Sequence, residues 1–148
     1  MPLENLVKNL FKKHLNKKKI LIFGNSGFVG SWLALTLSLF GADILGISLK
    51  MKNKNYLSNT NKFKKRIKTI NCDINNLDNV KANIIKFKPE IIIHLASQPI
   101  VKVGFTDPVK TYKTNITGTI KILEISRKIR TIKKIVVFTS DKVYSNSE

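Results

Sequence analysis

The chain has 148 residues, of which 43% are hydrophobic, enough for one domain with a buried core, and this excludes a wholly disordered polymer. Lys and Arg (27) outnumber Asp and Glu (9), so the formal net charge is +18. The single cysteine, Cys72, which we expect to be a buried spectator thiol, excludes an intramolecular disulfide and a cysteine-based metal cluster.

The positive charge has two interpretations. A net charge of +18 attracts nucleic acid or anionic lipid whatever the fold, so a basic binding protein is one hypothesis. The lysines, however, occur in nearly every polar stretch, without the interleaved aromatic residues that stack single-stranded bases. We therefore favour a compositional bias toward lysine and asparagine, and expect no specific nucleic-acid partner.

An amphipathic helix is predicted at the start of the chain. Leu3, Leu6, Val7, Leu10 and Phe11 recur at helical spacing with lysines between them. We assign residues 1–18 to a basic helical extension, which we expect to pack on the following domain rather than lie on a membrane. The apolar runs are too short to span a bilayer and no secretory signal opens the chain, so we expect a cytoplasmic protein without a membrane span.

Strands and helices alternate along the rest of the chain. Apolar runs predict five strands, at residues 19–23, 42–48, 66–72, 90–96 and 133–140. Helical patterns cover 28–40, 77–87 and 108–129, the last with Pro108 in its first turn, and a Lys- and Asn-rich loop follows the second strand. Strands that are apolar on both faces and alternate with helices predict an α/β fold, a doubly wound parallel sheet with helices on both faces, truncated after the fifth strand.

Three glycines spaced three residues apart follow the first strand, in the stretch GNSGFVGSW. Gly24 permits the tight turn that leaves the strand, Gly27 lets the backbone approach a pyrophosphate, and Gly30 lets the helix pack closely on the sheet. The start of the helix adds unpaired N–H groups and the positive end of its dipole. In this context the pattern predicts a Rossmann-type dinucleotide-binding domain over residues 19–148, rather than a turn of purely structural origin.

The residues alone leave the choice between NAD and NADP open. NAD sites usually have an acidic residue at the end of the second strand, but this strand ends in Ser48, and Lys50 or Lys52 is a candidate partner for a 2′-phosphate. Asp73, at the tip of the third strand, is placed to bond the adenine edge. His94 is interpreted as a core or supporting histidine, and no metal site is predicted.

Five motifs in order, GNSGFVGSWL, CDI, HLASQP, DPVKTYKTNITGT and FTSDKVY, resemble the extended short-chain dehydrogenase/reductase superfamily over about residues 18–148. The Trp after the third glycine, the HLASQP loop and the TSDK tetrad are most similar to the CDP-glucose 4,6-dehydratases. The resemblance implies a lyase with tightly held NAD, although NADP is not excluded. In such enzymes a hydride leaves C4 of the hexose, water is lost across C5 and C6, and the hydride returns to C6, converting CDP-glucose to CDP-4-keto-6-deoxyglucose.

The resemblance also implies residue roles. Ser140 matches the hydroxyl that binds the C4 oxygen, Asp141 the acid that protonates the departing C6 hydroxyl, and Lys142 a group that replaces a glutamate beside it. Without the other motifs, these three would be interpreted as a strand cap. The positions matched to cofactor binding are Gly24, Ser26, Gly27, Phe28, Val29, Gly30, Asp73, Ile74, Leu95, Ala96, Ser97, Gln98 and Asn115.

One part of the superfamily's chemistry is missing. A Tyr-x-x-x-Lys pair supplies the base, but none follows TSDK before Glu148, and Tyr144 is too close to the strand to be matched to it. We therefore expect the cofactor-binding part of a dehydratase, inactive alone, with a second chain as a candidate source of the missing half. The alternatives are an epimerase fragment and a non-catalytic dinucleotide-binding module, and a homo-oligomer is a further expectation.

Overall fold

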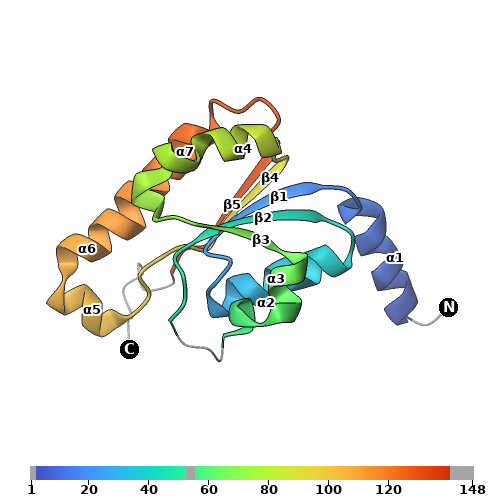
Figure 1. Cartoon of the computed structure of the whole chain (residues 1–148), viewed down its shortest axis with the longest axis horizontal. Coiled ribbons are helices and arrows are strands. Elements are labelled where there is room, and N and C mark those ends of the chain that lie inside the picture. The colour runs from blue at the N-terminus through green and yellow to red at the C-terminus, as the bar shows by residue number, and fades with distance from the viewer. Residues whose placement is uncertain (1–2, 53–55, 141–148) are drawn as a thin grey trace, which may run out of the picture.

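One parallel sheet organises the chain. The computed structural model describes residues 3–52 and 56–140, and its strand order is β3-β2-β1-β4-β5, with every neighbouring pair parallel (Figure 1). The strands are β1 (Lys19–Phe23), β2 (Asp43–Ser48), β3 (Lys68–Asn71), β4 (Ile91–His94) and β5 (Lys134–Val137). This is the strand order of a Rossmann fold, so the predicted fold class is confirmed.

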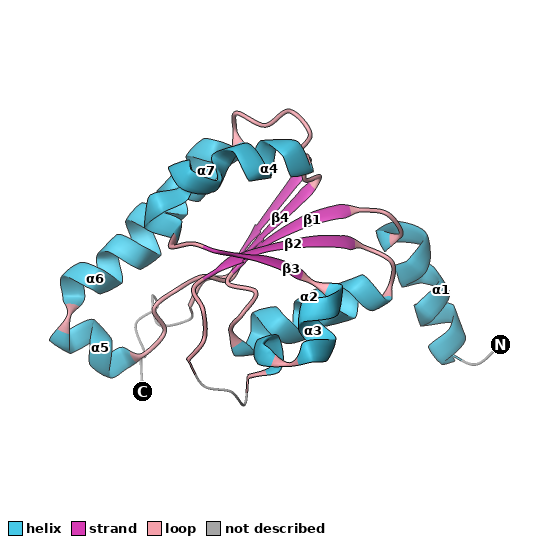
Figure 2. Cartoon of the chain, in the orientation of Figure 1, coloured by secondary structure: helices cyan, strands magenta, loops and turns pink. Residues whose placement is uncertain are grey.

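Helices cover both faces of the sheet, giving three layers (Figure 2). On one face lie α2 (Phe28–Leu39) and α3 (Asn61–Arg66), and on the other α4 (Lys81–Phe87) and α7 (Thr119–Ser126). The remaining helical segments are α1 (Leu3–Leu15), α5 (Val101–Thr106), α6 (Pro108–Tyr112), η1 (Leu57–Asn59), η2 (Ile74–Val80) and the π-helical η3 (Lys113–Gly118).

Alternate side chains of the apolar strands supply two separate cores. Ile20 and Ile22 of β1 pack with Phe63 on the side of α2 and α3. Leu21 and Phe23 pack with buried side chains of η2, α4 and α7 on the opposite side. This is why the first strand is continuously apolar: a strand covered on both faces buries every side chain.

Two short α-helices and one 3₁₀ turn lie where the sequence predicted no helix. The Lys- and Asn-rich segment after β2 contains η1 and α3, and Thr60 caps α3 by accepting a hydrogen bond from the Phe63 N–H. A second short helix, α5, precedes Pro108. Each of these α-helices has six residues, too few for a helical repeat of apolar positions to be recognised.

The helix predicted over residues 108–129 runs through α6, η3 and α7 and ends at Ser126. Its middle is π-helical, and there Gly118 lets the helix approach η2, because a Cβ at this position would lie 2.7 Å from Cγ1 of Ile74. Four of the predicted strands are one to four residues longer than the observed strands, because their end residues do not pair with a neighbouring strand.

The two edge strands are less covered than the three central ones: three of the four residues of β3 are exposed, and β5 is more exposed still. All four residues of β5 are exposed, and the exposed fraction of Val136 is 45%. It pairs with β4 along one edge, and no other strand of the described chain lies along its second edge. β5 is therefore an apolar edge strand in this structure.

The N-terminal helix makes only a small contact with the domain. The Phe11 ring stacks on Phe40 with centroids 5.2 Å apart, and Leu15 packs against the core. Leu6 and Leu10 are more than half exposed, so the expected packing is limited to the second half of α1. None of the helices in the described ranges has the length and hydropathy needed to cross a bilayer.

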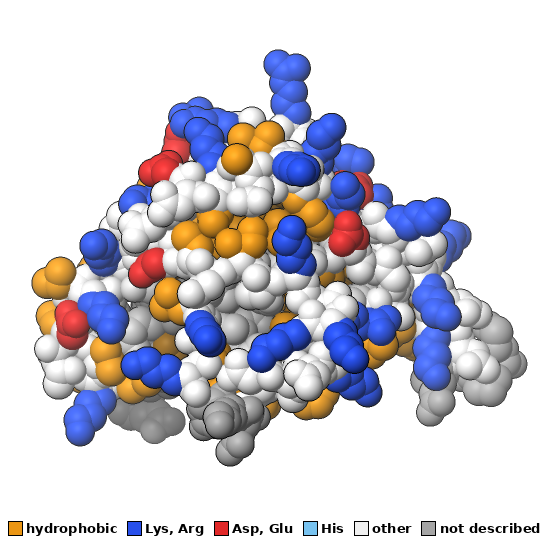
Figure 3. Space-filling model, in the orientation of Figure 1, with side chains coloured by type: hydrophobic (Ala, Val, Ile, Leu, Met, Phe, Trp, Pro, Cys, Tyr) orange, Lys and Arg blue, Asp and Glu red, His pale blue; other side chains and the backbone are white. Residues whose placement is uncertain are grey.

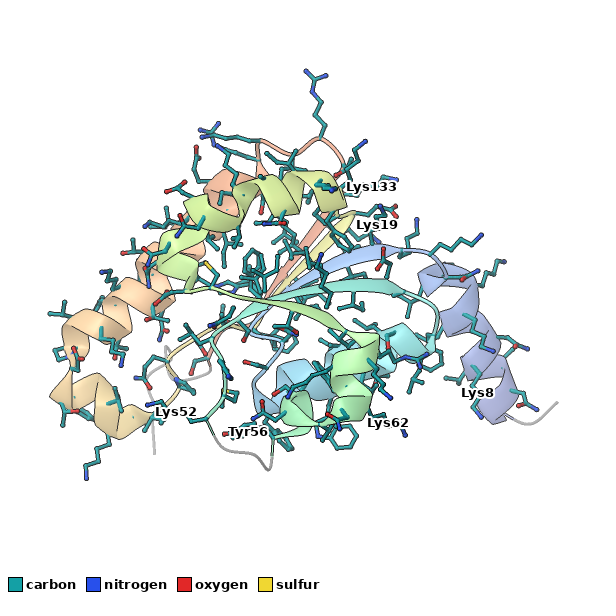
Figure 4. The ribbon with its side chains drawn as sticks, in the orientation of Figure 1. Lys8, Lys19, Lys52, Tyr56, Lys62 and Lys133 are labelled. Carbon is teal, nitrogen blue, oxygen red and sulfur yellow. The ribbon has the colours of Figure 1, made fainter. Side chains whose placement is uncertain are left out.

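Lysine and arginine side chains are dispersed over the face seen in Figure 3, with apolar side chains between them. Figure 4 shows the labelled lysines on distant elements: Lys8 on α1, Lys62 on α3, Lys52 after β2, and Lys19 and Lys133 at the opposite end of the sheet. On this face the charge does not form a single stripe, which favours the interpretation as a compositional bias.

Gly46 of β2 leaves space for a buried polar side chain. Asn25 is fully buried, its Nδ2 donates to Thr69 Oγ1 at 2.7 Å, and a Cβ on Gly46 would overlap its carboxamide. We expect Gly46→Ala to lower the free energy of unfolding by about 1–3 kcal/mol, measured by urea denaturation. Gly104→Ala is the control, since nothing lies within 4 Å of its added Cβ. Equal stability of the two variants would contradict the prediction.

Candidate functional site

A pocket of about 520 Å³ lies at the carboxyl ends of the strands. Its walls are the glycine turn after β1, the residues after β2 and β3, the loop after β4, and part of α6 and η3. The strand order reverses beside β1, because β2 and β4 pair with its two edges. Open parallel sheets bind ligands at this position.

Two glycines of the turn are required by the protein's own packing. Gly24 has φ +86°, and a Cβ there would lie 2.7 Å from the Ala96 backbone nitrogen. A Cβ on Gly30 would lie 2.9 Å from Cα of Asn25 and overlap the Gly24 carbonyl oxygen. Both positions therefore need glycine even without a ligand.

Gly27 differs from the other two. Its φ of −69° suits any residue, and the one protein atom near an added Cβ is the Gly24 carbonyl oxygen at an ordinary 3.5 Å. Gly27 lines the pocket and is the N-cap of α2, with no side chain capping the helix and no acidic residue in its first turn. The first N–H groups of a helix have no partner within it, so this end of α2 fits the pyrophosphate of a dinucleotide.

Phe28 and Val29 can contribute only through their backbone. Their side chains are 72% and 54% exposed and do not line the pocket. Their N–H groups belong to the first turn of α2, next to Gly27. The prediction that this segment faces a pyrophosphate thus concerns main-chain donors, not side chains.

A serine pair ties the glycine turn to the end of β2. Ser26 Oγ donates to the Leu49 carbonyl oxygen at 2.6 Å, so the 2.5 Å bond between the hydroxyls of Ser26 and Ser48 must use the hydrogen of Ser48. The Ser26 N–H also points at Ser48 Oγ, at 3.2 Å. The only hydroxyl hydrogen of Ser48 is therefore committed to the protein.

Asp73 and Ile74 line the wall formed by the residues after β3. Asp73 Oδ1 accepts hydrogen bonds from the backbone N–H and the side-chain amide of Asn75, at 2.8 and 3.0 Å, and so caps η2.

Cys72 is half-buried and also lines the pocket, which corrects the expectation of a buried thiol. Burial, followed by the charge of Asp73, raises the pKa of the Cys72 thiol, so it stays neutral at pH 7.

Gln98 and Asn115 do not line the pocket but hold its wall in place. The Gln98 N–H donates to Asn115 Oδ1 at 2.8 Å, and Asn115 Nδ2 donates to the Gln98 carbonyl oxygen at 3.2 Å. This pair fixes the loop after β4 to η3. Four residues of that loop, Leu95, Ala96, Ser97 and Pro99, line the pocket.

His94, the last residue of β4, helps to hold the same wall through a hydrogen bond to Thr119 of α7. Its Nε2 lies 2.9 Å from Thr119 Oγ1, and that hydroxyl donates to the Asn115 carbonyl oxygen at 2.7 Å, so it must accept from an Nε2–H. Nδ1 is buried without a hydrogen-bond partner. Burial lowers the pKa of the His94 side chain, so the neutral form is favoured and the interpretation as a core histidine is confirmed.

The buried neutral His94 predicts a stability that depends on pH. Its folded-state pKa lies below the ordinary 6.5, so its contribution is complete above pH 6.5 and is lost as the pH falls through the folded-state pKa. The loss has a limiting slope of about 1.4 kcal/mol per pH unit. Urea unfolding between pH 5 and 8 measures it; His94→Gln should flatten this part of the profile, whereas His14→Gln, on the exposed face of α1, should not.

Of the three catalytic residues expected at the end of the fifth strand, only Ser140 lies in the described part of the chain. Ser140 is exposed and does not belong to the pocket lining. Asp141 and Lys142, together with Tyr144, lie outside the described residues. Within those residues the structure contains no group of three or more His, Cys, Asp or Glu side chains that could hold a metal ion.

Of the thirteen positions matched to cofactor binding, eight line the pocket: Gly24, Ser26, Gly27, Asp73, Ile74, Leu95, Ala96 and Ser97. Sequence reasoning did not select Met51 and Tyr56, which come from the segment after β2 (Tyr56 is labelled in Figure 4), or Lys110, Lys113 and Thr114. The last three recur at spacings of three and four, which places them on one helical face.

Comparison with known proteins agrees with this geometry. A family model described as GDP-mannose 4,6 dehydratase matches residues 21–148. The chain belongs to this family. It is 36% identical over 131 residues to the CDP-glucose 4,6-dehydratase of Salmonella typhimurium, a match that covers 88% of the chain and 36% of that enzyme.

Solved structures similar to this GDP-mannose 4,6-dehydratase family member include two epimerases. An epimerase of Methanothermobacter thermautotrophicus has a TM-score of 0.83 at 23% identity, covering 99% of this chain and 42% of its own. UDP-glucose 4-epimerase of Brucella ovis, solved in complex with NAD, has a TM-score of 0.73 at 25% identity, covering 87% and 38%. The match covers 43% of the UDP-glucose 4-epimerase of Mycolicibacterium smegmatis, so the chain spans less than half the length of these relatives.

Proposed function

We propose that the chain is the NAD-binding part of a nucleotide-sugar 4,6-dehydratase that acts on CDP-glucose. The observation that carries the proposal is the pocket beneath the uncapped end of α2, where Gly27 leaves the backbone open to a pyrophosphate. The choice of CDP-glucose rests on the similarity to the Salmonella enzyme. The match covers 36% of that enzyme, so the activity is proposed for the whole enzyme, and we expect no turnover from these 148 residues alone.

The chain's own residues would divide the cofactor between them. The N–H groups at the start of α2 bind the pyrophosphate, Asp73 and Ile74 the adenine, and the loop Leu95–Ser97 the ribose and nicotinamide side. The nicotinamide, when bound, supplies the hydride acceptor. By the resemblance, Ser140 orients the C4 oxygen of the sugar, and Asp141, beside Lys142, gives a proton to the departing hydroxyl.

Titration calorimetry of the purified chain with NAD, at physiological salt to suppress nonspecific charge binding, tests the cofactor site. The proposal expects saturable binding with one site per chain. An assay with CDP-glucose and NAD tests the second half of the proposal: the chain alone should form no 4-keto-6-deoxy product. A folded chain that releases no heat, or turnover by the chain alone, would contradict it.

An epimerase is the second candidate function, favoured by the UDP-glucose 4-epimerase of Mycolicibacterium smegmatis, which is 30% identical over 141 residues. The two candidates share the cofactor site and differ in product. When a polypeptide that carries the Tyr and Lys pair is added, a dehydratase yields a 4-keto-6-deoxy sugar and an epimerase a 4-epimer. If neither forms while NAD still binds, the chain is a non-catalytic dinucleotide-binding module.

A further inference from the structure

The first half of α1 presents an apolar stripe to the outside of the molecule. Leu6, Val7 and Leu10 recur at spacings of three and four, so they share one side of the helix, and each is at least 41% exposed. We call these three residues the α1 stripe. The α1 side chains that pack on the domain, Phe11 and Leu15, lie further along the helix. The α1 stripe is therefore accessible to another surface.

The last turn of α1 is fixed to the sheet. The Lys17 N–H donates to the Gly41 carbonyl oxygen at 2.8 Å, and Lys18 Nζ donates to the Glu90 carboxylate at 2.8 Å. Because α1 leads directly into β1, it lies at the amino end of that strand, whereas the dinucleotide pocket lies at the carboxyl ends (Figure 1). A surface that covers the α1 stripe therefore leaves the pocket open.

The charge around α1 fits an anionic partner. Six lysines occur between residues 8 and 19, and no acidic residue occurs between residues 5 and 42. Lys8, Lys12 and Lys13 are exposed, and the ion pairs between side chains that the structure describes use none of them (Lys8 is labelled in Figure 4). At helical spacing Lys13 borders the α1 stripe, and the other two lie on the opposite face of the helix.

The apolar stripe distinguishes a lipid surface from nucleic acid. Nucleic acid offers phosphates, and bases that stack on aromatic rings, but no apolar phase that takes up leucine and valine side chains. An anionic bilayer offers both phosphates and acyl chains. Amphipathic helices with a lysine-rich polar face lie in its interface, with their apolar face buried at the boundary between the headgroups and the acyl chains.

We propose that α1 binds the chain to an anionic lipid surface, with the α1 stripe inserted below the headgroups and the lysines near the headgroup phosphates. Clusters of about four to eight basic residues on amphipathic helices favour membranes that contain acidic lipids. The inference goes beyond the proposed function and does not depend on it. It replaces the sequence-based expectation that residues 1–18 pack on the domain rather than lie on a membrane.

Co-sedimentation of the purified chain with lipid vesicles at physiological salt tests the proposal. We expect binding to vesicles of equal parts phosphatidylcholine and phosphatidylserine, and at least about tenfold weaker binding to phosphatidylcholine alone. Leu6→Gln/Leu10→Gln should weaken binding to the acidic vesicles about tenfold or more, because it removes apolar side chains and leaves the net charge unchanged. Both positions are exposed and glutamine is a good helix former, so the variant should fold normally.

The matched control is Phe105→Gln/Val109→Gln. These two apolar side chains, on α5 and α6, are more exposed than either leucine, and their replacement also leaves the net charge unchanged. We expect the control to bind the acidic vesicles within a factor of about two of the unchanged chain. The affinity for NAD, measured by calorimetry, should be the same with and without vesicles, because the pocket lies at the other end of the sheet.

Several results would overturn the inference. If the leucine variant binds as tightly as the unchanged chain, or if both variants lose binding equally, net charge or general apolar exposure attracts the vesicles and α1 has no special part. Failure of the folded chain to bind acidic vesicles has the same meaning. Binding of duplex DNA that is weakened by the leucine substitutions would assign the α1 stripe to nucleic acid. Absence of NAD binding, by contrast, contradicts the proposed function and leaves this inference standing.

Discussion

Gly27→Ala should nearly eliminate dinucleotide binding while the domain stays folded. The added methyl group meets no protein atom closer than 3.5 Å, and φ of −69° suits alanine, so the cost to stability is that of a poorer N-cap, about 0.5–1 kcal/mol. Gly27 lines the pocket next to the first N–H groups of α2, and a methyl group there holds the pyrophosphate away from them. We expect affinity to fall by a factor of about 100 or more, measured by calorimetry.

Gly30→Ala is the contrasting variant. Its added Cβ would overlap a backbone carbonyl that cannot move aside, so we expect a loss of about 3 kcal/mol or more of unfolding free energy. The two substitutions are three residues apart in the same motif, yet one should change binding and the other folding. Should Gly27→Ala bind dinucleotide as tightly as the unchanged chain, the pyrophosphate does not lie at this turn.

The second large effect expected is self-association of the 148-residue chain. A groove of about 700 Å³ runs between α7 and β5, lined by apolar Ile120, Leu123 and Ile135 and by charged residues that include Glu124 and Arg127. Beside it, the edge of β5 that pairs with no other strand of the described chain presents backbone N–H and C=O groups together with exposed Val136 and Phe138. Exposed apolar strand edges pair readily with other chains, so we expect oligomers or aggregates at micromolar concentration.

Size-exclusion chromatography with light scattering measures the association. Ile135→Lys, in the groove wall and on the edge strand, should shift the chain toward monomer because it buries a charge in any such contact. Leu39→Lys is the control, since Leu39 is an exposed apolar residue of α2, on the other side of the sheet, and does not line the groove. A stable monomer of the unchanged chain at high concentration is the result that would count against the prediction.

The fold was predictable because its strongest patterns are local. The run Lys19–Phe23 must be buried on both faces, and the glycines that follow it allow only a close turn into a helix. Short helices were missed for the opposite reason. Phe63 is the only buried residue of α3, so its anchor is a single tertiary contact that leaves no repeat in the sequence.

The site was predictable where backbone geometry dictates the residue type, as at Gly24 and Gly30. The site was less predictable where a side chain bonds to a residue far away in the sequence. From the sequence, Ser48 stands where NAD sites usually have an acidic residue. Its hydrogen bond to Ser26 becomes visible only when β1 and β2 are paired in the sheet. The assignment of Asn115 to the cofactor site stays a prediction; its hydrogen bonds to the backbone of Gln98 become visible only when η3 is placed beside the loop after β4.

The position of β5 at the edge of the sheet has a consequence for biosynthesis. The described residues that line the pocket at the carboxyl ends of the strands all lie between Gly24 and Thr114, ahead of β5 in the chain. The nascent chain therefore carries these pocket residues before β5 is translated. A dinucleotide that binds at this stage would stabilise the growing domain by mass action and keep the edge of β4 in place for pairing with β5.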